Sequence, residues 1–150
     1  MVAFYMGVIL SFSSDPSMVS NAKSGSIVEF VLPVVNRIVR TVGSQSISWG
    51  MLDTIIRKCA HMFNYCVLSI LCCNAFYITL QKWKLSYSLI FTWLLASAFS
   101  VIDEFYQTFV PGRSGQLLDV GIDNIGILVG IGIAILVFRF AIKKMKYTMK

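Results

Sequence analysis

Three long apolar segments dominate the pattern of hydrophobic and polar positions along the chain. They cover residues 55–80, 85–102 and 120–142, each close to the roughly 20 residues with which a helix crosses about 30 Å of hydrocarbon. A backbone in lipid must satisfy its polar groups internally, so these segments are predicted to be transmembrane helices. Residues 1–12 are also uncharged, but at 1.5 Å per residue they would cover only about 18 Å.

The shortness of residues 1–12 leaves several interpretations open. The first helix could begin further upstream, or the segment could be a half-span. It could also be the apolar stretch of a signal peptide, but it has no basic leader, and "SFSSDPS" follows it in place of a clear small-residue cleavage site. We therefore predict a short first transmembrane helix.

Residues 26–42 follow a different pattern. Valine, leucine and isoleucine fill most positions, and polar residues or proline recur with helical spacing on one side, at Glu29, Pro33, Asn36, Arg37 and Arg40. This predicts an amphipathic helix that lies on the membrane with its basic side near the headgroups. A helix packed against the bundle is the alternative. Residues 43–50 are expected to form a linker.

The composition supports a membrane protein. Of the 150 residues, 57% are hydrophobic and 13% are charged, whereas an ordinary soluble domain has about 25% charged residues. We therefore predict a single all-α membrane domain over residues 1–150. It should have about four transmembrane helices, the first one short, with an amphipathic interfacial helix between the first and second.

The basic residues indicate an orientation in the cell membrane. Two lie in the turn "QKWK", and five lie in the tail, at Arg139, Lys143, Lys144, Lys146 and Lys150. The positive-inside rule places both regions, and so both termini, in the cytoplasm. All seven acidic residues then fall on the outer side, together with six other basic residues. Anionic lipids explain the basic tail, so nucleic-acid binding is not expected.

A polar stretch lies between the last two apolar segments. Residues 103–126 hold four of the seven carboxylates, and "PGR" at residues 111–113 predicts a tight reversal of the chain. Helical spacing also places Lys58, His61 and Tyr65 on one face of the second spanning helix. We therefore predict one polar cluster at the outer mouth of the bundle, made of Lys58, His61, Tyr65, Asp103, Glu104, Gln107, Arg113, Asp119 and Asp123.

Small residues extend the acidic face of the last helix. Asp119, Asp123, Gly126 and Gly130 share one stripe, and glycines four residues apart let helices approach closely in lipid. The two acids should therefore point into the bundle. Ionisable groups at that depth are usually paired, and the expected partners are Lys58, His61 and Arg113.

Three stretches in this order resemble the VanZ-like family of bacterial membrane proteins. They are "KCAHMFNY" from Lys58, "DEFYQTFVPGR" from Asp103 and "DVGIDNIGILVG" from Asp119. "FSSDPS" also resembles the Ser-Ser-Gln-Pro stretch after the family's first helix, with Asp15 in place of the Gln. The resemblance covers about residues 12–130, and the matching motif residues are Lys58, His61, Tyr65, Asp103, Glu104, Gln107, Pro111, Gly112, Arg113, Asp119, Asn124 and Gly126.

The resemblance adds Asn124 to the predicted cluster and implies a role. The founding member of the family is associated with resistance to teicoplanin, a glycopeptide with a fatty acyl chain. The chain is therefore expected to act in glycopeptide resistance or cell-envelope physiology. Its partners would be membrane lipids, together with a lipid-linked envelope precursor or a lipoglycopeptide bound at the outer face.

Several kinds of chemistry remain open for the cluster. Arg113 and Lys58 could bind a phosphate or carboxylate. Alternatively, Glu104, His61 or Asp119 could transfer protons in a membrane-embedded enzyme acting on a phosphorylated envelope lipid, or the cluster could simply hold the helices in register. A proton-coupled carrier is less favoured, because the inner halves of the helices have almost no ionisable groups. No metal or other cofactor is expected, since the spacing lacks a paired-His motif.

The cysteines and some aromatic residues have structural interpretations. Cys59, Cys66 and Cys73 recur on one helix face and Cys72 adjoins the last, so they are expected to be small packing residues without a disulfide. Membrane-interface anchors are predicted at Trp83, Tyr87 and Tyr106.

Overall fold

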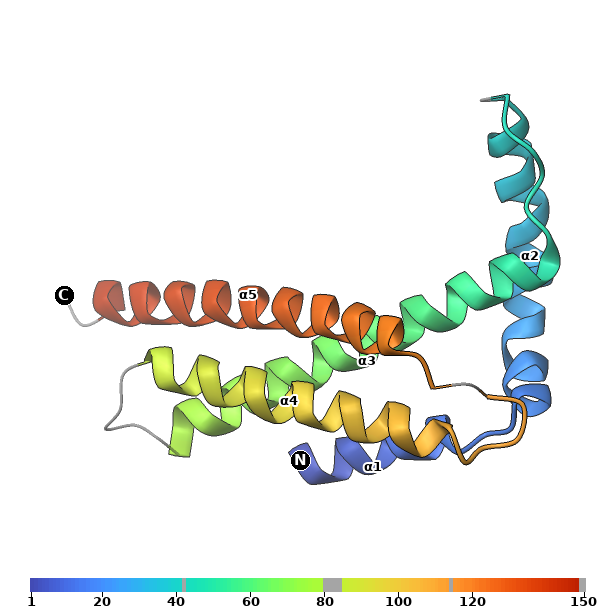
Figure 1. Cartoon of the computed structure of the whole chain (residues 1–150). Helices are drawn as coiled ribbons and strands as arrows, with labels where there is room; N and C mark the ends of the chain where they lie inside the picture. The colour runs from blue at the N-terminus through green and yellow to red at the C-terminus, as the bar shows by residue number, and fades with distance from the viewer. Residues whose placement is uncertain (42, 80–84, 114, 149–150) are drawn as a thin grey trace.

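The computed structural model describes residues 1–41, 43–79, 85–113 and 115–148, with side chains as far as residue 140. This part of the chain is all helical, which confirms the predicted fold class. The helices are α1 (Val2–Ser13), α2 (Ser17–Thr41), α3 (Trp49–Thr79), α4 (Leu85–Gln107) and α5 (Leu117–Thr148). In Figure 1, α3, α4 and α5 form an elongated bundle, α1 lies along its side, and α2 crosses one end of it.

Three of these helices are long and apolar enough to cross a membrane: α3, α4 and the Leu117–Phe140 part of α5. Each continues past its predicted polar end. Thus α3 begins at Trp49, α4 ends at Gln107 and α5 begins at Leu117. The apolar pattern marks only the part of a helix in hydrocarbon, whereas backbone hydrogen bonding continues through polar turns. The predicted linker at 43–50 is shortened to residues 43–48 for the same reason.

The first helix has only 12 residues. It forms a bent pair with α2, and the two helix axes differ by 96° at the short break between them. Pro16 lies in this break, where a residue without an N–H can precede a helix at no cost in hydrogen bonds. Among the described residues there are three spanning helices, and the predicted number of about four is reached only if α1 and α2 together count as one broken span.

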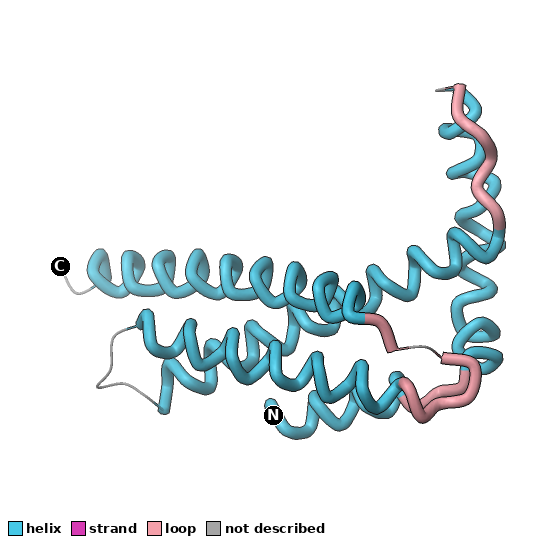
Figure 2. The backbone as a smooth tube through the Cα atoms, in the orientation of Figure 1, coloured by secondary structure: helices cyan, strands magenta, loops and turns pink. Residues whose placement is uncertain are grey.

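Helix α2 begins nine residues before the predicted amphipathic segment, since its serine-rich first turns have no apolar periodicity but still form helix. These first turns pack on α3. The second half projects beyond the bundle, and Figure 2 shows residues 43–48 running back along it. Asn36 binds both polar backbone atoms of Ile47, at 3.1 Å and 2.7 Å. The alternative, a helix packed against the bundle, applies to the start of α2, and a position on the membrane surface stays a prediction for its second half.

One exposed side of α2 is apolar. Ile27, Phe30, Val34 and Ile38 are each more than half exposed, and their spacing places them along one side of the helix. Since α2 crosses the bundle end, this stripe has the geometry of an interfacial helix.

A small core joins α1, α3, α4 and α5. Its buried members are Ile9, Tyr65, Leu68, Cys72, Ala96, Phe99 and Ile127. The α3 helix contacts all four other helices, so it is the centre of the fold. Near its start α1 is fastened to α3 by the Tyr5 hydroxyl, which donates to Asn64 Oδ1 at 3.2 Å.

The two glycines of the predicted stripe lie where α5 touches α3. A Cβ at Gly126 would fall on the backbone carbonyl oxygen of Met62, and its distance to the carbonyl carbon would be only 2.9 Å. A Cβ at Gly130 would fall on the carbonyl oxygen of Cys66 and on Ser69 Oγ. The close approach predicted from the four-residue spacing is confirmed.

The cysteine prediction holds for only part of the set. Cys72 and Cys73 are buried and Cys66 is partly buried, but Cys59 is exposed because no helix covers its side of α3. All four are free thiols. Tyr87 and Tyr106 are 46% and 42% exposed, as interface residues can be. Trp83, Lys82, Lys84 and Lys150 lie outside the described residues, as do the side chains of Lys143, Lys144 and Lys146.

Candidate functional site

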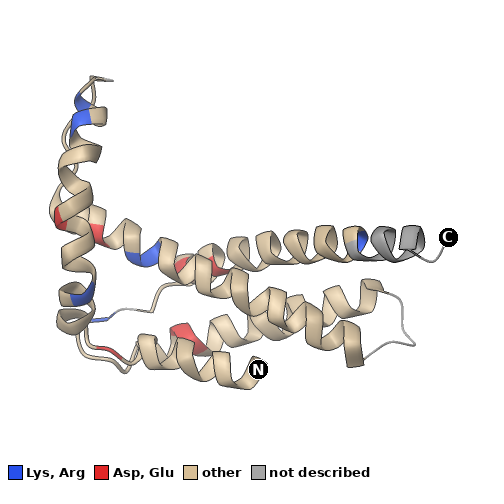
Figure 3. Ribbon diagram, turned by 180° about the vertical axis from the view of Figure 1, so that it is seen from behind, with Lys and Arg blue, Asp and Glu red and all other residues tan. Residues whose placement is uncertain are grey.

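Charged residues gather at one end of the bundle. In Figure 3 the ribbon is coloured for acidic and basic residues on α2, on the first turns of α3 and α5, and at the end of α4. Beyond this end, the described spanning helices carry no charged residue until Arg139. The polar end predicted from the sequence is therefore a real grouping in space, and its assignment to the outer side of the membrane stays a prediction.

A cleft of about 330 Å³ opens within this polar end, between α3, the end of α4, the start of α5 and the loop between the last two. We call it the polar cleft. Of the ten residues predicted for the cluster, seven line it: Lys58, His61, Glu104, Gln107, Arg113, Asp119 and Asp123.

The other three predicted residues lie outside the lining of the polar cleft and connect helices. The Tyr65 hydroxyl donates to Asp103 Oδ2 at 3.3 Å, which joins α3 to α4. Asn124 accepts a hydrogen bond from Ser97 at 2.7 Å, which joins α5 to α4. Asp103 and Tyr65 are fully buried, so this layer orders the helices beneath the cleft.

The carboxylates of α5 have different partners. Lys58 Nζ forms an ion pair with Asp119 Oδ1 across α3 and α5, as predicted. Asp123 is fully buried. The prediction of a cationic partner for it is wrong, because Asp123 Oδ2 instead accepts a hydrogen bond from the Ser100 hydroxyl at 2.7 Å. Its Oδ1 has no hydrogen-bond partner in the described part of the chain. The partner of Asp123 is thus a hydroxyl from α4, where the sequence predicted a basic side chain.

Glu104 connects the wall of the cleft to the loop above it. One carboxylate oxygen accepts the backbone N–H of Gln116 at 3.0 Å, and the other accepts Gln107 Nε2 at 3.2 Å. The neighbouring Asp103 instead accepts a hydrogen bond from the Tyr65 hydroxyl. Successive positions on a helix differ by about 100°, so the two acids face different surroundings and form no shared-proton dyad.

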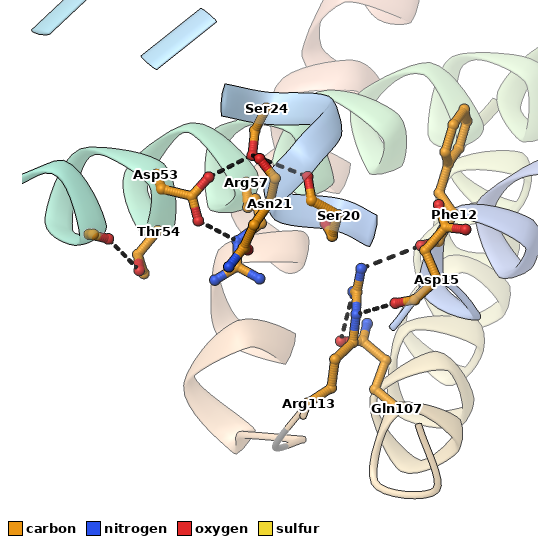
Figure 4. A network of polar contacts seen from close by, with 11 residues as sticks. Phe12, Asp15, Ser20, Asn21, Ser24, Asp53, Thr54, Arg57, Gln107 and Arg113 are labelled. Carbon is orange, nitrogen blue, oxygen red and sulfur yellow. Dashed lines mark hydrogen bonds and ion pairs between the residues drawn. The ribbon is translucent and has the colours of Figure 1, made fainter. Parts of the chain in front are cut away.

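Arg113 ties the α4–α5 loop to the break between α1 and α2. Figure 4 shows its guanidinium donating to the Asp15 carbonyl at 2.9 Å, the Phe12 carbonyl at 3.3 Å and Gln107 Oε1 at 3.3 Å. The reversal before it needs Gly112, whose φ is +76°. The chain turns there so that an arginine from one loop reaches the backbone of another.

All three acceptors of Arg113 are neutral. Among the described residues, no carboxylate forms an ion pair with it. Burial, with a smaller effect from the nearby Arg57, lowers the pKa of the Arg113 guanidinium from its usual value, and Asp15, Asp103 and Glu104 oppose that shift. The guanidinium keeps its proton at neutral pH, so it places a positive charge on the cleft wall, and no carboxylate among the described residues forms an ion pair with it.

His61 lines the same cleft, and its Nδ1 is buried without a hydrogen-bond partner among the described residues. In that same part of the chain, no group of three or more His, Cys, Asp or Glu side chains converges as metal ligands would. His61 is thus available as a hydrogen-bonding group beside Arg113.

Sequence reasoning missed Asp53, which is 2% exposed. It accepts a hydrogen bond from Ser24 of α2 and forms an ion pair with Arg57 Nε at 3.2 Å. When the Asn21 amide is oriented to donate, its nitrogen lies 3.3 Å from Asp53 Oδ2. Figure 4 shows the two side chains facing each other. The i,i+4 spacing of Asp53 and Arg57 was a usable signal, but only the fold shows that α2 is fastened there.

We expect Asp53→Asn to loosen α2 from α3. The variant loses the charge on a buried acceptor, and hydrogen bonds to charged groups contribute about 1.5–3 kcal/mol. Thermal unfolding of the purified protein in detergent should show a lower midpoint. Glu29→Gln removes an exposed carboxylate from α2 and should leave the midpoint unchanged. Equal midpoints for Asp53→Asn and wild type would show that this contact does not hold α2.

Comparison with known protein families gives one match. The profile of the VanZ/LLP1 family matches residues 1–139. Comparisons with curated proteins and with solved structures give no significant match. The matched range includes every residue that lines the polar cleft and all ten residues predicted for the cluster. With this coverage, and with an all-helical fold that has the lengths of membrane spans, the chain belongs to the VanZ/LLP1 family.

Proposed function

We propose that the polar cleft recognises the anionic head group of an envelope amphiphile at the outer face of the membrane. The amphiphile would be a lipid-linked precursor or a lipoglycopeptide of the teicoplanin type. Its capture would change susceptibility to that antibiotic or another property of the cell envelope. The observation that carries the proposal is Arg113, a partly buried guanidinium whose hydrogen bonds all go to neutral oxygens.

The charges around Arg113 support this proposal. Three basic residues line the cleft, but Lys58 is paired with Asp119, and Arg57 is paired with Asp53. Arg113 is the cation left for a ligand among these three. A planar guanidinium can donate two parallel hydrogen bonds to a phosphate or carboxylate. Its present acceptors are neutral oxygens, so an anion could replace one of them.

The size and position of the cleft also favour an amphiphile. A volume of about 330 Å³ falls within the roughly 300–1,000 Å³ of small-molecule sites, which suits a head group better than a whole glycopeptide. The cleft lies at the end of three spanning helices whose outer surfaces are apolar. A head group at the membrane surface would therefore meet Arg113 while its chains stayed in lipid.

A second function is supported by Glu104 and His61. Both line the cleft, Glu104 is 5% exposed, and His61 Nδ1 has no hydrogen-bond partner within the described part of the chain. Such groups can transfer protons when they lie within hydrogen-bond reach of a substrate. The alternative is therefore a membrane-embedded enzyme acting on a phosphorylated envelope lipid.

Expression in a susceptible Gram-positive host tests both ideas. We expect the wild-type chain to raise resistance to teicoplanin more than to vancomycin. Arg113→Gln should remove that difference, because a lost charge-assisted hydrogen bond of about 1.5–3 kcal/mol weakens binding tenfold or more. Glu104→Gln keeps a similar shape and should retain most of the effect if the cleft only binds.

Arg40→Gln is the matched control, because Arg40 is exposed on the projecting half of α2. All variants must reach the membrane in equal amounts, as measured by immunoblot. No selective effect on teicoplanin from the wild type would remove the resistance role. A complete loss from Glu104→Gln at normal abundance would favour the enzyme.

A further inference from the structure

A second cleft lies beside the polar cleft, between α2 and α3 and next to the α1–α2 break. Its volume is about 390 Å³. We call it the α2–α3 cleft. The two clefts share Arg57, His61 and Arg113, which therefore form a partition between them. Figure 4 shows that Arg57 and Arg113 reach this region from α3 and from the loop after α4.

The charges on the two sides of the partition differ. The polar cleft is lined by three basic residues and three carboxylates. Among the described residues, the α2–α3 cleft is lined by Lys23, Arg57 and Arg113 and by one carboxylate, Asp15. Even with Arg57 paired to Asp53 just outside this lining, the basic groups outnumber the acidic ones. The α2–α3 cleft therefore has an excess of positive charge. This side attracts an anion and disfavours a head group that carries its own cation.

Lys23 is placed to take part in such binding. Its Nζ lies 2.5 Å from Asp15 Oδ2 and 5.8 Å from the centre of the Phe12 ring. The Lys23 side chain is 58% exposed, and ion pairs this exposed contribute little to stability. A phosphate could therefore replace Asp15 as its partner without disturbing the fold.

Four of the other residues that line the α2–α3 cleft are apolar. Phe12, Ile27, Ile56 and Ala60 come from α1, α2 and α3, and Phe12 and Ile27 are 51% and 53% exposed. The basic groups thus lie beside a surface suited to acyl chains. A bilayer lipid could place its phosphate among the basic residues while its upper chain stayed against these side chains, whereas a free anion would use only the polar part.

We propose that the α2–α3 cleft binds an anionic phospholipid of the surrounding membrane. Its phosphate contacts Lys23 and Arg113, and its upper acyl chain lies against Ile27, Ile56 and Ala60. This inference does not depend on the polar cleft binding a lipoglycopeptide, because Lys23, Ile27 and Ala60 do not line the polar cleft.

Native mass spectrometry of the purified full-length protein tests the proposal. The protein is released from micelles that contain phosphatidylglycerol or phosphatidylcholine with the same acyl chains. We expect retention of one phosphatidylglycerol and little phosphatidylcholine. Lys23→Gln should weaken retention about tenfold, the effect of a lost charge-assisted contact. Ala60→Trp should abolish retention by filling the apolar part of the cleft.

Two matched variants keep the test specific. Arg37→Gln removes another cation of α2, and Cys59→Trp adds the same bulk at the exposed neighbour of Ala60. Neither residue lines the α2–α3 cleft, so both variants should retain phosphatidylglycerol like the wild type. Equal thermal midpoints in detergent will show that all four variants are folded.

Three outcomes would overturn the proposal: equal retention of phosphatidylcholine, wild-type retention by Lys23→Gln and Ala60→Trp, or full displacement of the lipid by inorganic phosphate at matched concentration. The last would identify a simple phosphate site. Lipid retention is measured without any resistance phenotype. Failure of the teicoplanin assay therefore leaves this result unchanged, and failure here leaves the polar cleft to be judged by its own assay.

Discussion

Gly126→Leu is expected to prevent the protein from accumulating in folded form. A Cβ at this position would fall on the backbone carbonyl oxygen of Met62, so no side-chain rotation on α3 can make room for it. Overpacking a core by a few methylene groups costs about 1–3 kcal/mol. The cost should be higher here because two helix backbones must separate, and α3 is the helix on which the other four pack.

Size-exclusion chromatography of the membrane protein in detergent measures this effect. The Gly126→Leu variant should give little monodisperse protein at equal expression. Gly132→Leu is the matched control on the same helix, since a Cβ there would meet no heavy atom within 4 Å. It should behave like the wild type. Normal yield and stability for Gly126→Leu would mean that α3 and α5 are not in contact at this residue.

Lys58→Glu should have the second-largest effect. The new carboxylate would face Asp119 in place of its present ion pair, and Glu104 and Asp123 line the same cleft. The side chains of Lys58 and Asp119 are 33% and 26% exposed, so the loss should fall between that of exposed and buried pairs, at about 1–3 kcal/mol. The thermal midpoint in detergent should drop accordingly.

The double variant Lys58→Asp with Asp119→Lys separates structure from recognition. Reversing both charges restores the attraction between α3 and α5, so the thermal midpoint should recover even though Lys58→Asp and Asp119→Lys each lower it alone. Recovery of stability without recovery of the teicoplanin effect would show that the polar cleft requires this charge arrangement for recognition. Recovery of both would mean that the pair only holds the helices in register. Additive losses in the double variant would contradict a direct ion pair.

The sequence by itself determined the class of protein and the polar end of the bundle. Apolar segments of spanning length are helical in lipid, because a helix satisfies its backbone hydrogen bonds within the one segment. Charges are costly within hydrocarbon, so Lys58, Asp103, Glu104 and Asp119 had to group where the helices leave it. The role of Gly126 and Gly130 could also be predicted, since glycines four residues apart allow two packed helices to approach closely.

Local pattern left the helix ends undetermined. The first turns of α2 and α3 and the last turn of α4 mix polar and apolar residues, so nothing in their periodicity distinguishes helix from loop. Asp53 belongs to such a turn, and its burial depends on Ser24 and Asn21 from a different helix. Spacing along one chain does not reveal which helix will supply a partner.

The tertiary structure alone decided how the polar residues are divided. It turned Asp103 and Tyr65 into a layer between helices, gave Asp123 a serine as its partner, and brought Arg113 to the backbone of a loop about a hundred residues away in the sequence. It also created the partition between two clefts of different charge. The contacts of Arg113 and the α2–α3 cleft involve the break between α1 and α2. The 96° bend there sets α2 across the bundle end, and no local pattern of apolar residues specifies it.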